Sequence, residues 1–338
     1  MASAISSARW LTLTFALAAC SSSHPGQANT PAQTPSETPM ARVPGNPFAG
    51  AQFLVAPYTN ADQERKRLER EHSPDAAFLA KIADTPQARW FGEWSGDIET
   101  TASNYVKAAH NRGKVALLVA YNLPNRDCGQ YSAGGASDPA KYRHWIDGLA
   151  KGIGPARRAI VILEPDALGQ LDTCLSPADQ QQRLELLNYA ITTLESLPGV
   201  AVYLDAGHSR WVPAAKMAER LKAAGVAKAR GFSLNVANFM PDDELIAYAE
   251  QLIALLGDTH FVIDSSRNGN GPTDDNQWCN PAGRALGKPP TSDTGNPHLD
   301  AFVWVKNPGD SDGECNGGPP AGQWFSARAL EMARAAKW

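Results

Sequence analysis

The chain has 338 residues, of which 43% are hydrophobic and 20% charged, and its formal net charge at pH 7 is −4. This length and composition predict one large globular domain with a substantial buried core. Because the charge is weakly negative and no basic run occurs, nucleic acid is excluded as an expected partner.

Residues 1–19 have the features of an export signal. Arg9 precedes an apolar stretch, 10–19, that is too short to span a bilayer. The stretch continues into the sequence LAAC ending at Cys20, which resembles the lipobox of bacterial lipoproteins, where cleavage leaves the cysteine to carry lipid. An ordinary cleaved signal is the alternative. We predict an exported protein, either secreted or a bacterial cell-envelope lipoprotein attached to the membrane only through Cys20.

Residues 20–46 have no periodicity and are rich in Ser, Pro, Thr, Ala and Gln. A segment of this composition cannot bury a core. It predicts a flexible tether between an anchor and the folded domain, or disorder without that role. The folded domain is expected over residues 47–338.

Strand-like and helical patterns alternate through the rest of the chain, which is typical of a parallel sheet covered by helices. Proline directly after a capping residue, as in Asp138-Pro139 and Ser176-Pro177, marks helix starts. The predicted helices include 98–111, 139–151, 177–196, 213–224 and 242–256. The predicted strands are 52–56, 88–91, 114–121, 159–163, 200–204, 231–236, 260–263 and 301–305.

Two long segments, 264–298 and 306–323, are rich in Gly, Pro, Asn and Asp. Loops this long in a compact domain are usually functional or disordered, and one cysteine in each favours order. The four cysteines after Cys20 allow three pairings by spacing alone, and their spacing does not suggest a zinc site. Export favours disulfides over free thiols. The four are Cys128, Cys174, Cys279 and Cys315.

Asp127, Asp166 and Asp312 each follow an apolar run that reads as a buried parallel strand. In barrel-like α/β folds the loops at the carboxyl ends of the strands converge on one face, where chemistry takes place. Three carboxylates on that face indicate acid/base catalysis. For Asp166, capping of a helix N-terminus is the competing interpretation.

Successive segments of the chain resemble, in order, the signature segments of glycoside hydrolase family 6, which comprises cellulases. The resemblance runs from about residue 47 to the C-terminus. It implies a single α/β domain, a distorted and incomplete parallel β/α barrel of about seven strands, that hydrolyses β-1,4-glucan with inversion at the anomeric carbon. The segments are YNLPNRDC (121–128), ILEPDALG (162–169), YLDAGHSRW (203–211), NVANF (235–239), DSSRNG (264–269), QWCNPAGRALG (277–287) and WVKNPGDSDGEC (304–315).

The resemblance also implies roles for the three acids. Asp166 matches the general acid of the family. Asp127 matches an aspartate that raises the pKa of the acid and organises the attacking water, although it could instead pair with Arg126 in a surface turn. Asp312 matches a candidate base, with proton relay through water as the alternative. The disulfides implied are Cys128–Cys174 and Cys279–Cys315, each beside a catalytic loop.

Several further residues match sugar-binding positions of the family. Asp310 stands where many members have glutamate, which suggests binding rather than proton transfer. Asp205 matches an acid that shapes the site, with a buried structural role as its competitor. Trp304 is expected in the core, and Ala214 replaces a second tryptophan of some members. The expected binding residues are Trp90, Tyr121, Asp205, His208, Trp211, Asn235, Trp278, Lys306 and Asp310.

In the family that the chain resembles, processive members enclose the glucan under long loops bridged by these cysteines. The intervals here resemble the short version, which implies an open cleft and an endo-β-1,4-glucanase. A cellobiohydrolase-type exo-acting enzyme and a non-catalytic glucan-binding lipoprotein are the alternatives. A serine esterase is not supported, because Trp211 stands where the G-x-S-x-G elbow requires glycine. We expect a monomer with no cofactor or metal. The Gly- and Asp-rich segment 264–275 could suggest calcium, but it lacks the EF-hand spacing.

Overall fold

The computed structural model describes residues 38–42 and 44–338. The predicted signal peptide, 1–19, and the predicted lipid attachment at Cys20 lie outside the described residues. None of the helices in the described part of the chain has the length and apolar character needed to cross a membrane.

The described end of the predicted tether, 20–46, contacts the folded domain. The N–H of Met40 donates to the carbonyl oxygen of Pro155 (3.1 Å). Arg42 forms an ion pair with Glu195 (3.1 Å). This part of the segment therefore lies against the domain rather than apart from it.

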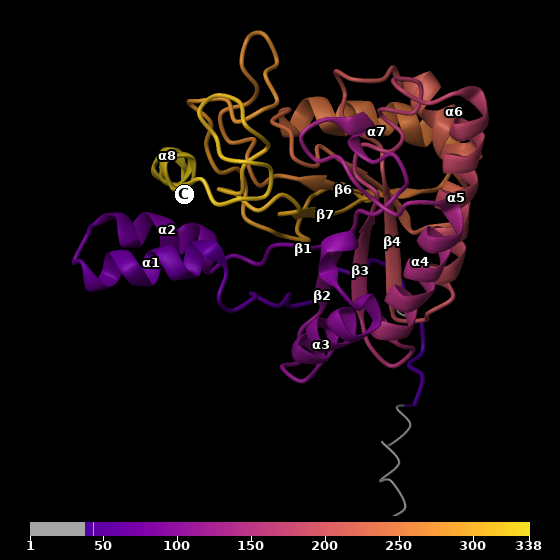
Figure 1. Cartoon of the computed structure of the whole chain (residues 1–338), viewed down its shortest axis with the longest axis horizontal. Coiled ribbons are helices and arrows are strands. Elements are labelled where there is room, and N and C mark those ends of the chain that lie inside the picture. The colour runs from indigo at the N-terminus through magenta and orange to yellow at the C-terminus, as the bar shows by residue number, and fades with distance from the viewer. Residues whose placement is uncertain (1–37, 43) are drawn as a thin grey trace, which may run out of the picture. The chain divides into compact units, whose positions relative to one another are not determined.

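Seven parallel strands form one sheet in which each strand pairs with the next along the chain (Figure 1). Nearly every strand residue is buried, as expected for a sheet covered on both faces. The strands are β1 (Arg89–Phe91), β2 (Ala116–Ala120), β3 (Ala159–Leu163), β4 (Val200–Asp205), β5 (Gly231–Leu234), β6 (His260–Asp264) and β7 (Leu299–Val303).

The sheet curls so that β1 and β7 come close to each other. The barrel is incomplete because these two strands do not pair. The N–H of Ala88, just before β1, donates to the carbonyl oxygen of Trp304, just after β7 (2.9 Å). The indole of Trp90 donates to the carbonyl oxygen of Val305 (2.9 Å). The predicted distorted barrel of about seven strands is confirmed.

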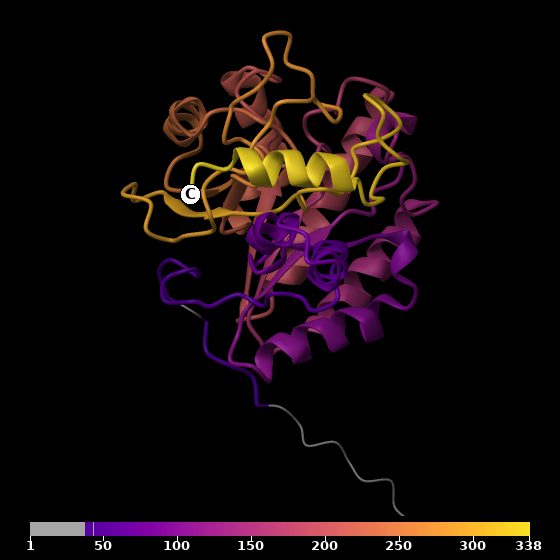
Figure 2. The same cartoon turned by 90° about the vertical axis from the view of Figure 1, so that its left-hand side faces the viewer.

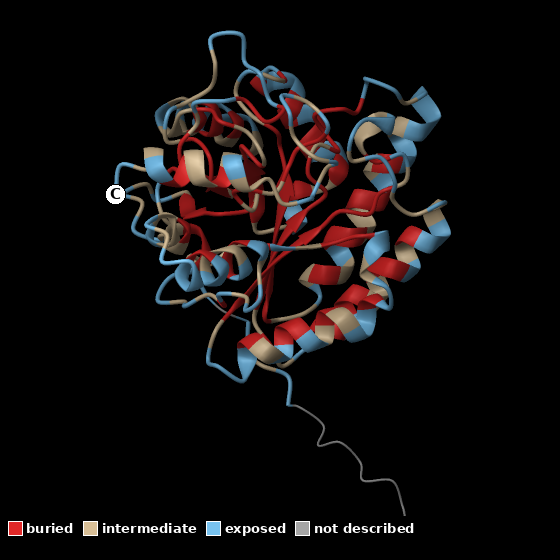
Figure 3. Ribbon diagram, turned by 60° about the vertical axis from the view of Figure 1, so that its left-hand side comes forward, coloured by how far each residue is buried: buried red, intermediate tan, exposed pale blue. Residues whose placement is uncertain are grey.

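Alternate residues of each strand face two separate parts of the core. In β2, Leu118 packs with the outer helices, whereas Leu117 and Val119 face the inside of the barrel. Figure 3 shows the buried strands at the centre and exposed residues on the outer faces of the helices. The inner part is filled with side chains, so the barrel is a packed core and not a pore.

Helices connect most of the strands and cover the outer face of the sheet (Figure 1). Two begin where the sequence predicts a cap: Asp138 and Ser176 each accept a hydrogen bond from the first turn of the helix that follows. Asp97 caps a third helix in the same way. These helices are α3 (Ile98–His110), α4 (Pro139–Ile153), α5 (Pro177–Glu195), α6 (Ala214–Ala224) and α7 (Asp242–Leu256).

Three other helices, outside the five ranges named from the sequence, pack together beside β7: α1 (Asn60–Arg70), α2 (Asp75–Ala83) and α8 (Ser326–Ala335). Figure 2 shows α8, from the C-terminal end of the chain, beside α1 and α2 from its N-terminal part. Trp304 is fully buried among them, which confirms its predicted place in the core.

One predicted strand is wrong. Residues 52–56 make only a single parallel bridge, between Phe53 and Val115, just before β2. Two backbone hydrogen bonds hold this contact, Val115 N to Gln52 O (2.8 Å) and Leu54 N to Val115 O (3.1 Å). The segment has the apolar pattern of a strand, but β1 pairs with residues 118–120 of β2, which confines the segment to the residue just before β2.

Candidate active site

Asp166 lies three residues beyond the end of β3, in a strained turn. Glu164 and Asp166 both have positive φ (50° and 69°), a conformation that non-glycine residues rarely adopt and that clusters at functional sites. Burial, together with the negative charges of Asp205 and Asp127, raises the pKa of the Asp166 carboxyl well above its ordinary value. The site therefore favours the protonated form of Asp166, which a general acid requires.

Asp205, the last residue of β4, is buried beneath the cleft and does not line it. Its carboxylate accepts the N–H of Asp166 (3.0 Å), the N–H of Gly207 (3.1 Å) and the hydroxyl of Ser233 (3.2 Å). Burial raises its pKa to about 7. Asp205 therefore positions the backbone of Asp166, and its place differs from the sugar contact expected from the sequence.

Glu164 anchors the loop after β2 in a similar way, and it was not singled out from the sequence. Its buried carboxylate accepts the N–H groups of Asn122 (3.0 Å) and Leu123 (3.1 Å). Burial raises its pKa to about 7. Glu164 thus ties the turn after β3 to the loop that carries Tyr121 and Asp127.

Asp127 lies in that loop with φ 54°, directly before Cys128 with φ 50°. Its two carboxylate oxygens accept hydrogen bonds from the side chain of Gln170 (2.9 Å) and the N–H of Ser132 (2.8 Å). The disulfide Cys128–Cys174 joins this loop to the segment after β3, with a Cα–Cα distance of 5.7 Å.

The turn partner considered for Asp127, Arg126, is engaged elsewhere. Its guanidinium donates to both carboxylate oxygens of Glu93 (2.5 and 2.9 Å) and to the carbonyl oxygens of Tyr121 (2.9 Å) and Ser132 (2.8 Å). The pairing of Asp127 with Arg126 in a surface turn does not occur, so Asp127 faces the cleft without that partner.

Asp312, in the loop after β7, is buried and held by two cations. Arg267 donates to both of its oxygens (3.0 and 2.8 Å) and the N–H of Asn280 donates to one of them (3.0 Å). Lys306 forms an ion pair with the other oxygen (3.0 Å). Burial raises the pKa of Asp312, but the charges of Arg267 and Lys306 outweigh it and hold the pKa below its ordinary value. Asp312 is therefore ionised and highly constrained.

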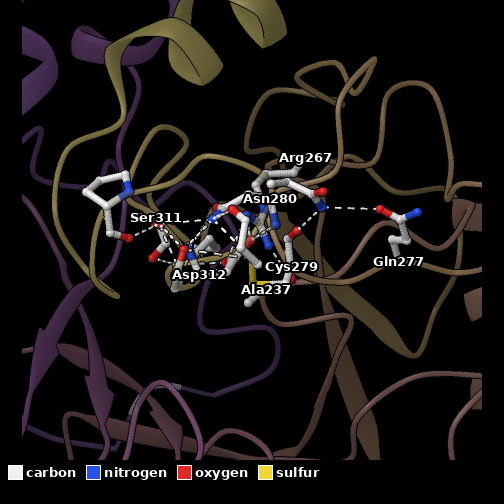
Figure 4. Close-up of a disulfide and its surroundings, with 12 residues drawn as sticks. Ala237, Arg267, Gln277, Cys279, Asn280, Ser311 and Asp312 are labelled. Carbon is white, nitrogen blue, oxygen red and sulfur yellow. Dashed lines mark hydrogen bonds and ion pairs between the residues drawn. A yellow bond between two sulfur atoms is a disulfide. The ribbon is translucent and has the colours of Figure 1, made fainter.

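The second disulfide, Cys279–Cys315, lies beside Asp312 with a Cα–Cα distance of 6.1 Å (Figure 4). Asn280, next to Cys279, donates from its side chain to Ser311 Oγ (3.0 Å) and Gly313 O (2.8 Å). Both disulfide pairs implied by the family resemblance are present. The pairs hold the loops of Asp127 and Asp312 in place.

A cleft of about 950 Å³ joins these loops. Asp205 and Asn235 are the expected site residues that do not line it. The side chain of Asn235 is buried and donates to the carbonyl oxygen of Asp264 (2.8 Å). The expected residues that do line the cleft are Trp90, Tyr121, Asp127, Asp166, His208, Trp211, Trp278, Lys306, Asp310 and Asp312.

Trp211 and His208 form one wall of the cleft, with ring centroids 5.7 Å apart. A Cβ atom at Gly169 would come within 2.7 Å of the Trp211 ring, so glycine is needed there to let the indole lie against the backbone. Burial lowers the pKa of His208 to about 4, so its imidazole is neutral at pH 7 and serves as a hydrogen-bonding group.

Asp310 is also in the cleft, and the side chain of Asn307 donates to it (3.2 Å). Burial raises its pKa, against the opposing charge of Lys306.

In the described part of the chain, no group of three or more His, Cys, Asp or Glu residues is arranged to hold a metal ion.

Trp94 and Tyr131 line the cleft as well, and sequence patterns did not single them out. Tyr131 extends from the loop of the first disulfide and meets Trp278, which precedes the second; their ring centroids are 6.1 Å apart. Exposed tryptophans in loops are a weak signal that could have drawn attention to Trp94 and its neighbour Glu93.

The sequence model of the family described as "Glycosyl hydrolases family 6" matches residues 48–336. Endoglucanase A of Cellulomonas fimi is 45% identical over 288 residues, which cover 85% of this chain and 62% of that protein. Endoglucanase 1 of Streptomyces halstedii is 45% identical over 287 residues, which cover 81% of this chain and 87% of that protein. This chain therefore spans less than two thirds of the first relative and most of the second.

Among solved structures, the endoglucanase Cel6 from Mycobacterium tuberculosis, in complex with methyl-cellobiosyl-4-deoxy-4-thio-beta-D-cellobioside, has the same fold. The match has a TM-score of 0.82 at 45% sequence identity, and it covers 86% of this chain and 99% of that one.

Proposed function

This chain belongs to glycosyl hydrolase family 6, and we propose that it is an endo-acting β-1,4-glucanase that inverts the anomeric configuration. The observation that carries the proposal is Asp166. It lines the cleft, and burial and two neighbouring carboxylates favour its protonated form. A protonated carboxyl group in an aromatic-walled cleft is what cleavage of a glycosidic bond requires.

In an inverting reaction, Asp166 protonates the leaving oxygen while a water molecule attacks the opposite face of the sugar ring. Asp127 supports this step in two ways. Its charge raises the pKa of Asp166, and its carboxylate is fixed by Gln170 and Ser132 so that it can orient the water. The aromatic rings of the cleft hold the glucan in register for the attack.

Asp312 is the candidate base, but its surroundings weaken it as a direct proton acceptor. Arg267 donates to both of its oxygens, the N–H of Asn280 donates to one and Lys306 forms an ion pair with the other, and the neighbouring cations lower its pKa. A proton relay through water therefore agrees better with this geometry than direct abstraction by Asp312. The ion pairs with Arg267 and Lys306 then serve to fix the wall of the cleft.

The endo mode of attack is supported by the names of the two relatives that are 45% identical, both endoglucanases. We expect the viscosity of soluble carboxymethylcellulose to fall while only a small fraction of its bonds is cleaved. In the same digests, NMR should detect the α-anomer first. Release of cellobiose without loss of viscosity would instead indicate the exo-acting alternative, and no hydrolysis at all would indicate the glucan-binding one.

We also propose that the protein is exported and carries lipid on Cys20, on the basis of the LAAC sequence that ends there. In a bacterial host, labelled fatty acid should be incorporated into the wild-type protein and not into Cys20→Ala. Equal labelling of the two proteins would contradict this attachment.

A further inference from the structure

Trp94 is the most exposed aromatic side chain of the cleft, with 55% of its surface accessible. It lies in the short 3-10 helix η1 (Glu93–Ser95) that follows β1. It is not among the sugar-binding positions that the family resemblance implies. A large apolar side chain exposed inside a polar-rimmed cleft indicates a binding surface.

Arg126 supports Trp94 from one side. The guanidinium carbon of Arg126 lies 4.9 Å from the ring centroid of Trp94 and 4.7 Å from that of Tyr121. Because both distances are within the range of cation–π contacts, one guanidinium connects the two rings. Trp94 is thus linked through Arg126 to Tyr121, which stands beside Trp90 in the cleft (5.2 Å between centroids).

The support itself is rigid, because Arg126 is buried and its guanidinium has several hydrogen-bond partners. Its side chain is only 5% exposed, and Glu93 holds it through two hydrogen bonds. Carbonyl oxygens of Tyr121, Ser132 and Ala133 accept its remaining hydrogen bonds. An indole resting on such a group needs little ordering when a ligand arrives.

The indole of Trp94 also lies close to the backbone at Gly92. A Cβ atom at this position would lie 2.4 to 2.8 Å from three carbons of the Trp94 indole. Only glycine lets the ring lie this close to the backbone, and in this packing 55% of the surface of Trp94 stays open to solvent. Trp94 is therefore held in position before any ligand binds.

We propose that Trp94, supported by Gly92 and Arg126, binds one further glucosyl unit of the glucan, beyond the part of the cleft lined by Trp90 and Tyr121. The C–H groups on the face of a pyranose ring would stack on the exposed indole. The consequence is a preference for longer chains. This inference rests on the proposed glucanase function.

The test compares wild type, Trp94→Ala and Trp94→Phe on cello-oligosaccharides from four to six units. For Trp94→Ala, kcat/KM on the longest substrate should fall about tenfold, equivalent to about 1.4 kcal/mol. The loss should shrink as the substrate shortens. Trp94→Phe should recover much of it, because phenylalanine also offers a flat apolar face.

The affinity for the longest substrate should also be lower with alanine than with tryptophan at position 94 when no catalysis takes place. In an Asp166→Asn background, calorimetry should show weaker cellohexaose binding with Trp94→Ala than with tryptophan at position 94. Trp338→Ala is the matched control, because Trp338 is similarly exposed (44%) but does not line the cleft. It should leave both measurements unchanged.

A loss of the same size at every chain length, or none at any length, would overturn the role of Trp94. The first result would mean that Trp94 only supports the loop of Arg126. Failure of the glucanase function itself would look different, since the wild type would then hydrolyse none of the substrates.

Discussion

Replacing Asp166 with Asn should lower kcat on β-1,4-glucan by about 10³-fold, within the range that general acid catalysis contributes. Asparagine has nearly the same size and shape but carries no proton that it can donate to the leaving oxygen. The N–H of residue 166 still donates to Asp205, so the turn after β3 should keep its conformation. Initial rates on carboxymethylcellulose, with thermal unfolding measured in parallel, check this expectation.

A substrate that needs no acid separates loss of the proton from loss of the fold. In an aryl β-cellotrioside whose phenol is strongly acidic, the phenolate can leave without being protonated. Cleavage of this substrate should therefore be much less impaired in Asp166→Asn. The control is Asp172→Asn. Asp172 lies in the same loop but outside the cleft, where it pairs with Lys216 and Arg220. Equal losses on both substrates would remove Asp166 from the role of acid.

The sheet and its outer helices could be predicted from the sequence because their signals are local. A run of apolar residues defined β3, and the cap at Ser176 with the proline that follows it defined the start of α5. The segment 52–56 shows the limit of such patterns. Its residues suit a strand, but a strand also needs a free edge, and the position of β1 beside β2 is a long-range fact that no local pattern contains.

Some features of the site could likewise be predicted from local patterns in the sequence, and others could not. Residues in the loops that follow strands, such as Asp127 and Asp166, could be placed at the cleft because the topology brings the carboxyl ends of parallel strands together. Asp205 was expected to help form the site, but whether it faces sugar or the backbone of Asp166 depends on side-chain direction. The pairing of Arg126 with Glu93 joins residues from different loops, and nothing in either segment alone indicates it.

Replacing Asp127 with Asn should lower kcat at pH 7 by about 10²-fold and move the basic limb of the pH–rate profile to lower pH. The negative charge of Asp127 is one of the causes that raise the pKa of Asp166, so its removal lowers that pKa. Because Asp166 acts in its protonated form, activity is lost as the pH rises through its pKa. A lower pKa therefore means that the loss begins at lower pH. Profiles of kcat/KM for the wild type and the variant measure the shift.

The direction of this shift distinguishes an electrostatic role of Asp127 from a purely structural one. Asparagine can accept only one of the two hydrogen bonds that Gln170 and Ser132 donate to Asp127, so some loss of rate could come from a loosened loop. A loosened loop lowers the rate at every pH and leaves the limb in place. Asp172→Asn, which changes a carboxylate outside the cleft, should also leave the limb in place. A basic limb that stays fixed or moves to higher pH in Asp127→Asn would show that Asp127 does not tune the acid, and its role would then be confined to orienting the water.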